Sequence, residues 1–392
     1  MPAPNADGMP LSGVRVVALE QAVAAPFASR QLADMGADVI KIERPGGGDS
    51  ARAYDSALRG NSAYFAWLNR GKRSVMLDVK RPDDHEVAAR LLEEADVFVH
   101  NLAPGAVERL GFGYDDLAAR NGRLVWCGIS GYGPDGPLRD KKAYDMLVQA
   151  ESGVVSVTGS AEEPAKVGVS MADISSGLYA YSSILAALLK RERTGRGERI
   201  DISMLECLTE WMTPALYVYQ GTGAIAARVG VRHNMIVPYG AYACRDGAVL
   251  FAIQTQREWQ RFCAQVMDDA LLEADPRFAT NADRLANRAV LEQLIERRFG
   301  EFDRATVTAW LDAADIPTGA VNDIPSVVSH VQLAARNRWT TVAGPSGQIP
   351  ALVPPHNLAG APPRMGAVPA LGAHTAEVLA ELGLVNDSGG ER

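Results

Sequence analysis

The sequence predicts an α/β fold with a mostly parallel, doubly wound sheet and a second, smaller domain. Three observations support this fold class. Short apolar runs rich in β-branched residues alternate with helical patterns through the first half of the chain. A chain of 392 residues is too long for one compact core, which suggests two or three domains. After residue 220 the pattern changes to a hairpin followed by helices, which indicates a change of domain.

Five short strands and two helices are expected in the first 130 residues. The strands are 14–19, 38–42, 75–79, 97–100 and 124–129. A helix is expected over 26–35, because Pro26 fits a first turn and Gly36 ends the pattern. A second helix, over 83–95, separates two of the strands.

The later part of the chain is expected to be mainly helical. In order, the elements are a helix over 173–191, a strand over 199–203, a helix over 204–219, a hairpin of 239–244 and 248–253, helices within 258–313 and a last helix over 374–382. The stretch 221–237, rich in glycine and small residues, is the expected crossing between domains. The proline-rich stretch 343–369 is expected to run extended over a surface.

Composition and charge argue against several classes of protein. The 39 basic and 47 acidic side chains give a net charge of −8, which argues against a dedicated nucleic-acid-binding protein. No apolar run reaches the roughly 18 residues of a membrane span, and the N-terminus lacks the pattern of a signal peptide. The four cysteines match neither a zinc motif nor a disulfide framework, so we expect a reduced, cytoplasmic enzyme.

The first 44 residues have the length of a dinucleotide-binding βαβ unit, but their first turn lacks its glycines. The turn over 20–25 therefore does not fit the Rossmann fingerprint, in which glycines let the backbone approach a pyrophosphate. One G-x-G-x-x-G pattern begins at Gly131, but Pro134 and Pro137 prevent a helix from starting there. A nicotinamide oxidoreductase is therefore disfavoured. The six histidines are scattered, and no metal site is predicted.

Several basic residues lie just beyond the carboxyl ends of predicted parallel strands. Arg44, Arg109 and the cluster 139–142 have this position. Ligands of open α/β sheets bind at that edge, and several cations there would suit a phosphate-bearing ligand such as a nucleotide or coenzyme A (CoA). The alternative is a solvated basic rim, since charge is common at the ends of loops.

Asp173 stands between a short run of small residues and a long apolar helix. The simpler interpretation is a helix N-cap, for which aspartate is among the preferred residues. The functional interpretation is a carboxylate nucleophile that the helix dipole holds ionised and that small neighbours leave accessible. One residue can serve both roles only if one carboxylate oxygen stays free.

Taken together, the motifs resemble the family III CoA-transferases (CaiB/BaiF), the group of formyl-CoA and carnitine CoA-transferases. The matching segments are 11–17, 35–46, 69–74, 101–105, 131–133 with 136–137, 143–145, Asp173 with 177–179, and 369–375. The resemblance covers nearly the whole chain and, as a set, is highly specific. It implies a Rossmann-like large domain built from both chain ends, residues 1–222 and 330–392. It also implies a smaller α+β domain, residues 223–329, and an interlocked homodimer.

The resemblance further implies covalent catalysis at Asp173. Its carboxylate would attack the donor thioester to give an acyl-aspartyl anhydride, and the released CoA thiolate would then form an aspartyl-CoA thioester. No cofactor would be permanently bound, because the CoA thioester is itself the substrate. The CoA contacts implied by the same match are Ala22, Val23, Ala24, Arg44, Leu77, Asn101, Arg109, Lys142 and Tyr144. The flexible glycine-rich loop of formyl-CoA transferase has no obvious counterpart after Tyr239.

The chain is similar to members of the family that act on short dicarboxylic acids. This similarity implies a succinyl-CoA-like donor and an acceptor such as mesaconate, itaconate, citramalate, malate or glutarate. A distal carboxylate needs a cation or polar donors in the acyl pocket, and Arg52, Arg232 and His233 are the side chains proposed for it. The alternative for all three is a place in the domain or dimer interface.

Two other activities are compatible with the same fold. The α-methylacyl-CoA racemases resemble the chain at Asp173 but have Gly-His-Asp where it has Ala143, Tyr144 and Asp145. Racemisation needs an acid and a base on both faces of the α-carbon, and a tyrosine with a pKa near 10 replaces the histidine poorly. The other alternative is a non-catalytic acyl-CoA-binding protein, since fold does not imply function. The presence of Asp173 among small residues argues against it.

Overall fold

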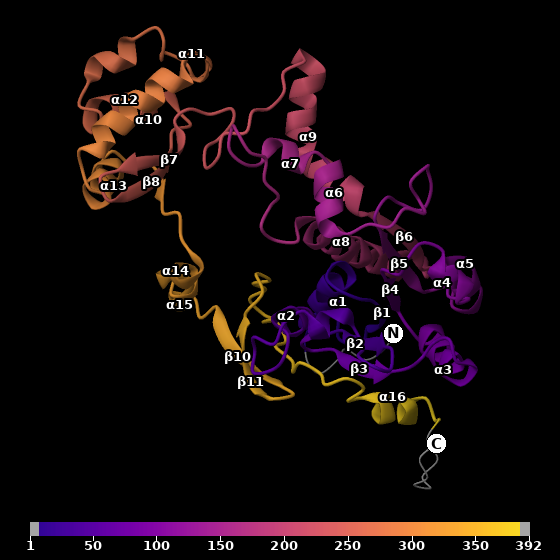
Figure 1. Cartoon of the computed structure of the whole chain (residues 1–392). Coiled ribbons are helices and arrows are strands. Elements are labelled where there is room, and N and C mark those ends of the chain that lie inside the picture. The colour runs from indigo at the N-terminus through magenta and orange to yellow at the C-terminus, as the bar shows by residue number, and fades with distance from the viewer. Residues whose placement is uncertain (1–7, 385–392) are drawn as a thin grey trace. The chain divides into compact units, whose positions relative to one another are not determined.

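The computed structural model describes residues 8–384, which divide into two compact units (Figure 1). The first unit runs to Val154, takes up Lys166–Pro214 and resumes at Gln332. The second unit consists of Val155–Ala165 and Ala215–Val331. Both ends of the described chain therefore belong to one unit. The domain boundaries expected from the sequence, with a smaller domain over 223–329, remain a prediction.

A six-stranded parallel sheet forms the centre of the first unit. Its strands are β1 (Arg15–Leu19), β2 (Asp38–Glu43), β3 (Arg73–Met76), β4 (Val97–His100), β5 (Val125–Ser130) and β6 (Glu198–Ser203). They lie in the order β3-β2-β1-β4-β5-β6, and every neighbouring pair is parallel. The predicted α/β fold with a parallel sheet is confirmed. The strand order reverses between β1 and β4, and ligands of open α/β sheets bind in the crevice at such a point.

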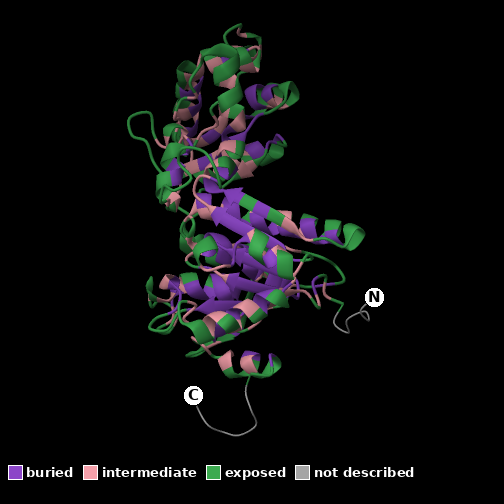
Figure 2. Ribbon diagram, turned by 90° about the vertical axis from the view of Figure 1, so that its right-hand side faces the viewer, coloured by how far each residue is buried: buried purple, intermediate pink, exposed green. Residues whose placement is uncertain are grey.

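Helices cover the sheet, so its strands are buried while the outer helix faces are exposed (Figure 2). The helices of this unit are α1 (Ala24–Asp34), α2 (Ala63–Asn69), α3 (Pro82–Glu93), α4 (Ala106–Arg109), α5 (Tyr114–Arg120), α6 (Asp145–Glu151), α8 (Met171–Thr194) and α16 (Thr375–Glu381). α7 (Val154–Val157) and α9 (Met204–Thr222) start in this unit and continue into the second, at Val155 and Ala215 respectively. Val16, Val17 and Ala18 of β1 are fully buried, as expected of a strand covered on both faces. By length and composition alone α8 could cross a membrane, and half of its apolar stretch is buried within the protein.

β3 begins two residues earlier than the apolar pattern predicts. Its first two residues, Arg73 and Ser74, are polar. Arg73 pairs with Asp38 of β2 at 2.6 Å, and the amide of Ser74 donates to Nδ1 of His374 at 3.1 Å. Arg73 also pairs with Glu381 of α16, which packs against this edge strand. Polar partners from the far end of the chain thus complete a strand that a search for apolar runs does not detect.

A cluster of buried charges holds the glycine-free turn between β1 and α1. Glu20, directly after β1, accepts hydrogen bonds from Lys41 at 3.2 Å and from Lys72 at 2.6 Å. Asp49 accepts from Lys41 at 2.8 Å through one oxygen and from the amide of Ala22 at 3.0 Å through the other. Ala22 has a φ of +62°, a conformation that costs a residue with a side chain about 1 to 2 kcal/mol. The buried charge cluster offsets this strain, and its two lysines belong to the core.

The first part of the proline-rich stretch 343–369 pairs in a hairpin, which the sequence analysis does not predict. β10 (Trp339–Gly344) and β11 (Gly347–Leu352) pair antiparallel. Val342 and Ile349 belong to a buried cluster that also contains Phe65 of α2. The apolar pattern does not predict these strands, since only Val342, Ile349 and Ala351 of the two strands belong to the buried cluster and most other positions are exposed. Residues 353–370 carry no helix, as predicted.

The second unit combines a small antiparallel sheet with helices. The predicted hairpin is present as β7 (Tyr239–Cys244) and β8 (Gly247–Ala252), and β9 (Thr318–Gly319) adds a third strand. The helices are α10 (Gln256–Arg261), α11 (Asn281–Ala286), α12 (Arg288–Gly300), α13 (Arg304–Ala313) and α14 (Ile324–Val328). α15 (Val331–Ala335) begins at the last residue of this unit and continues in the first unit from Gln332. Phe251 of β8 stacks on Phe262 with ring centroids 5.2 Å apart, in a core that is separate from that of the first unit.

We predict that Glu20→Gln destabilises the fold by about 3 to 5 kcal/mol, because it leaves two buried ammonium groups without their shared carboxylate. Urea unfolding measures the change. The matched control is Glu93→Gln, which removes an exposed ion pair with Arg120 and should cost less than about 1 kcal/mol. Equal effects of the two substitutions would contradict the importance of the buried charge cluster.

Candidate active site

Asp173 lies in the first turn of α8 and not at its N-cap, which is Ser170. The side chain that accepts hydrogen bonds from the first-turn amides comes from α6. The Asp145 carboxylate, at the start of α6, accepts hydrogen bonds from the amides of Ala172 at 2.8 Å and Asp173 at 3.3 Å. The N-cap interpretation of Asp173 is therefore wrong, because a carboxylate distant in sequence supplies the acceptor. Within residues 8–384 no hydrogen bond or ion pair engages the Asp173 carboxylate.

The half-buried Asp173 carboxyl group is not an ordinary surface acid. Burial, followed by the negative charge of Asp145, raises its pKa to about 7. This shift runs opposite to the effect expected of the helix dipole, which favours the ionised form. A carboxyl group whose pKa is raised by burial and a like charge is typical of a functional site.

α8 packs against α1 at a distance that only glycine allows. A Cβ added to Gly177 would lie 2.5 Å from the carbonyl oxygen of Ala24 and 3.0 Å from the Phe27 ring. Gly177 follows Asp173 by four residues, and residues four apart lie on one face of a helix. The close contact therefore turns the Asp173 face of α8 toward the first residues of α1.

The loops after β1 and β4 are joined where the strand order reverses. The side chain of Asn101, directly after β4, accepts from the amide of Gln21 at 2.9 Å and donates to its carbonyl oxygen at 2.8 Å. Gln21 directly precedes Ala22, Val23 and Ala24. The structure thus brings four of the sequence-predicted CoA contacts to the crevice that α/β folds use for ligands.

The three predicted cationic contacts are exposed and lack a carboxylate partner within the described chain. Arg44 follows β2, Arg109 ends α4 and Lys142 lies in the loop before α6. None of the three pairs with a carboxylate within residues 8–384. The neighbours of Lys142 differ, since Arg139 pairs with Asp140 and Lys141 pairs with Glu151. Of the basic cluster 139–142, Lys142 is thus the cation available to a ligand.

The two remaining predicted CoA contacts differ in exposure. Leu77, directly after β3, is buried, and its amide donates to the carbonyl oxygen of Glu43 at 2.9 Å. Tyr144 precedes α6 and is 74% exposed, so its ring is free to contact a ligand. The CoA role of both residues stays a prediction.

The three side chains proposed for the distal substrate carboxylate already have partners. In the first unit, the Arg52 guanidinium pairs with Glu43 at 2.7 Å. In the second unit, Arg232 pairs with Glu292 at 3.0 Å, and His233 stacks on Tyr239 with ring centroids 5.2 Å apart. Their substrate role stays a prediction, and each has a structural role in its own unit.

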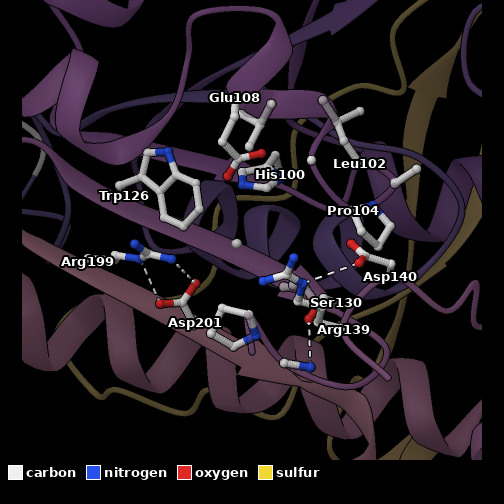
Figure 3. A pocket seen from close by; sticks show the side chains of 17 residues that line it. His100, Leu102, Pro104, Glu108, Trp126, Ser130, Arg139, Asp140, Arg199 and Asp201 are labelled. Carbon is white, nitrogen blue, oxygen red and sulfur yellow. Dashed lines mark hydrogen bonds and ion pairs between the residues drawn. The ribbon is translucent and has the colours of Figure 1, made fainter. Parts of the chain in front are cut away.

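A pocket of about 280 Å³ adjoins the loop after β4 (Figure 3). His100 and Trp126 line it together with the pairs Arg139–Asp140 and Arg199–Asp201. Both ring nitrogens of His100 lack a hydrogen-bond partner within the described chain, and burial lowers its pKa to about 3. The imidazole is therefore neutral. No residue of α1 or α8 lines this pocket, which separates it from the Asp173 crevice.

Two functional residues have no role in the sequence analysis beyond membership of a motif. Asp145 caps α8, and Gly177 permits its contact with α1. Gly177 carries a detectable signal, because a glycine inside an apolar helix costs about 1 kcal/mol relative to alanine and therefore indicates a packing reason. Asp145 has no such signal in the sequence, because the amides that it caps are 27 and 28 residues away.

The family description CoA-transferase family III matches residues 11–375. The chain belongs to this family. It is 35% identical to the succinate–glutarate CoA-transferase of Agrobacterium fabrum, over 95% of this chain and 96% of that protein. It is also 35% identical to the acetyl-CoA:oxalate CoA-transferase of Acetobacter aceti, over 90% of this chain and 92% of that protein.

A solved structure of the same family is also similar to this chain. The crystal structure of a CaiB/BaiF family protein from Brucella suis is 34% identical, with a TM-score of 0.83, over 95% of this chain and 99% of that one. The predicted family is confirmed. With family membership and relatives of this similarity along most of its length, the chain is a CoA-transferase.

We predict that Asp173→Asn stabilises the protein at pH 8 by about 1 to 3 kcal/mol. The folded pKa of about 7 exceeds the ordinary value of 3.8, so ionisation of Asp173 opposes folding increasingly as pH rises from about 4 to 7. Urea unfolding of both proteins at pH 4, 6 and 8 measures the gain, which should grow with pH and level off above pH 7. A gain that does not depend on pH would contradict the raised pKa.

We predict that Gly177→Ala pushes α8 away from α1 and lowers kcat/KM by about 100-fold, because small displacements of a reacting group are costly. Steady-state kinetics measure the loss. The matched control is Gly221→Ala in α9, where an added Cβ would meet nothing within 4 Å. A Gly177→Ala enzyme as active as this control would contradict the close contact.

Proposed function

We propose that this enzyme moves CoA from a succinyl-CoA-like thioester to a short dicarboxylic acid, with Asp173 as the covalent carrier. The observation that carries the proposal is the free Asp173 carboxylate, whose pKa is raised to about 7 on the face of α8 that turns toward the start of α1. A more basic carboxylate is a better nucleophile once it has lost its proton.

The first half-reaction transfers CoA to the enzyme. An oxygen of ionised Asp173 attacks the thioester carbon, the C–S bond breaks and CoA leaves as the thiolate. The donor acyl group is then joined to Asp173 as a mixed anhydride. The thiolate attacks the Asp173 carbonyl carbon, which gives the aspartyl-CoA thioester and releases the donor acid.

The second half-reaction repeats these steps in reverse order. The acceptor carboxylate attacks the aspartyl-CoA thioester, releases the thiolate and forms a new anhydride with Asp173. The thiolate attacks the acceptor side of that anhydride, which gives the new acyl-CoA and regenerates the Asp173 carboxylate. No proton enters or leaves overall, so the nucleophile needs only to start ionised.

The exposed cations favour a phosphate-bearing substrate at the same edge of the sheet. Arg44, Arg109 and Lys142 follow different strands, and each lacks a carboxylate partner within the described chain. Unpaired guanidinium and ammonium groups form strong, charge-assisted hydrogen bonds with phosphate oxygens. We assign the phosphates of CoA to these three side chains, with the pantetheine arm directed toward Asp173.

The choice of a dicarboxylic acceptor rests on the relatives. Two that are 35% identical to this chain are named for glutarate and for oxalate, which are both dicarboxylic acids. Arg52, Arg232 and His233 would each have to bind the distal carboxylate in addition to their present partners. The proposal includes a cytoplasmic homodimer, interlocked as the family resemblance implies, with no resident cofactor.

We predict that mixing the protein with succinyl-CoA and a panel of free acids yields new acyl-CoA species, with glutarate among the best acceptors. Mass spectrometry of the thioesters measures the exchange. Asp173→Asn should reduce it by at least about 1,000-fold, since the amide cannot form the anhydride. Exchange that persists in this variant would contradict the role of Asp173. Loss of the α-proton into D₂O from a branched acyl-CoA, without exchange, would favour a racemase.

We predict that Lys142→Ala raises KM for the acyl-CoA about 10-fold, which corresponds to about 1.4 kcal/mol, with little change in kcat. The lost contact is made to the unreactive end of the substrate and so contributes to binding alone. The matched control is Lys141→Ala, whose ammonium group already pairs with Glu151 and should leave KM within about twofold. Equal KM values for the two variants would contradict the phosphate assignment.

A further inference from the structure

α6 holds the segment that leads into α8 by two side chains one turn apart. Asp145 accepts from the amides of Ala172 and Asp173 through Oδ1, and its Oδ2 accepts from Gln149 at 2.7 Å. Gln149 is completely buried. Its amide group donates to the carbonyl oxygen of Val169 at 3.2 Å and accepts from the amide of Val167 at 2.9 Å. α6 therefore fixes the backbone on both sides of the helix start.

These contacts leave no free amide in the first turn of α8. The amide of Met171 donates to Val169 at 2.8 Å, and that of Ile174 donates to Ser170 at 2.9 Å. The amides of Ala172 and Asp173, which lie between these two, donate to Asp145. An aspartate in a first helical turn readily accepts from nearby backbone amides, which would make its oxygens less available for attack.

We propose that Asp145 is a positioning residue for the transfer reaction. By occupying the first-turn amides of α8, its carboxylate keeps the Asp173 side chain free of its own helix and available to the thioester. This inference rests on the proposed function, because it assigns Asp145 a role in the reaction at Asp173.

The charge of Asp145 acts in the same direction as its hydrogen bonds. The charged groups on the elements packed against α8 are Arg30 and Asp34 on α1, Asp145 and Glu151 on α6, and Glu198, Arg199 and Asp201 on β6. Of these, Asp145 is the group whose charge raises the pKa of Asp173, in addition to burial. Asp145 thus makes the nucleophile more basic as well as more accessible.

Two substitutions separate the hydrogen bonds of Asp145 from its charge. Asp145→Asn keeps an oxygen that can accept from the two amides of α8, but removes the charge and the second oxygen, which accepts from Gln149. Asp145→Ala removes the whole carboxylate and frees the amides to bind Asp173. The control for loss of a helix cap is Asp303→Ala, since Asp303 caps α13 through the amide of Thr306 at 2.8 Å. We measure kcat, KM and the pH dependence of kcat/KM for the full-length protein.

Asp145→Ala should lower kcat by about 30-fold or more while KM for the acyl-CoA stays within about threefold, because an interaction of the reacting group is lost and substrate binding is not. Asp145→Asn should restore most of kcat at its own optimum. Without the like charge, the pKa of Asp173 should be lower. The acid-side midpoint of kcat/KM should therefore lie at a lower pH in Asp145→Asn than in the wild type. Asp303→Ala should unfold at a lower temperature with kcat unchanged.

Two results would overturn the proposal. One is an Asp145→Ala enzyme that loses thermal stability as Asp303→Ala does but keeps the wild-type kcat. The other is an Asp145→Asn enzyme with the same kcat and the same acid-side pH dependence as Asp145→Ala. Either result would leave Asp145 as a structural cap alone.

The CoA exchange assay of the wild type tests the proposed function separately from the role of Asp145. If the wild type exchanges no CoA between any donor and acid, Asp173 is followed instead by carbon-13 NMR of its side-chain carboxyl, assigned with Asp173→Asn. The titration midpoint of Asp173 should then be lower in Asp145→Asn than in the wild type. An unchanged midpoint would overturn the inference about Asp145 whatever reaction the protein performs.

Discussion

The buried charge cluster of Glu20, Lys41, Asp49 and Lys72 is the interaction on which the rest of the site depends. It holds a turn that has no glycine, although Ala22 needs a left-handed conformation there. The turn starts α1, and α8 packs on α1 through Gly177. The position of Asp173 thus follows from side chains after β1, within β2, in the loop after β2 and directly before β3. Each step is a close contact in which little displacement is possible.

Acidic groups lie at Asp173, and basic groups lie beyond the carboxyl ends of the strands. At Asp173, burial and the nearby Asp145 disfavour the carboxylate form, so the ionised group is more basic than an ordinary carboxylate. Beyond the carboxyl ends of the strands, Arg44 and Lys142 are exposed and have no carboxylate partner within residues 8–384, which suits the proposed binding of the CoA phosphates. In the proposed reaction, the remote part of the substrate supplies binding energy at these cations while its reacting end meets the Asp173 carboxylate.

The sequence predicts the parallel sheet well, because strands buried on both faces read as continuous apolar runs. It fails where polar partners from far along the chain define the structure. The start of β3 depends on α16, and the cap of α8 depends on Asp145. The position of Asp173 before an apolar helix fits a helix N-cap as well as a functional residue, and the direction of its pKa shift depends on burial and on α6. Neither can be read from spacing alone.

The mass of the intact protein after mixing with succinyl-CoA, in the absence of an acceptor acid, tests most directly whether Asp173 carries CoA. Rapid acid quenching followed by peptide mapping locates any adduct. We expect one CoA bound as a thioester on the peptide that contains Asp173, and no adduct in Asp173→Asn. CoA exchange by a wild-type protein that forms no adduct, or an adduct on another residue, would contradict covalent transfer through Asp173.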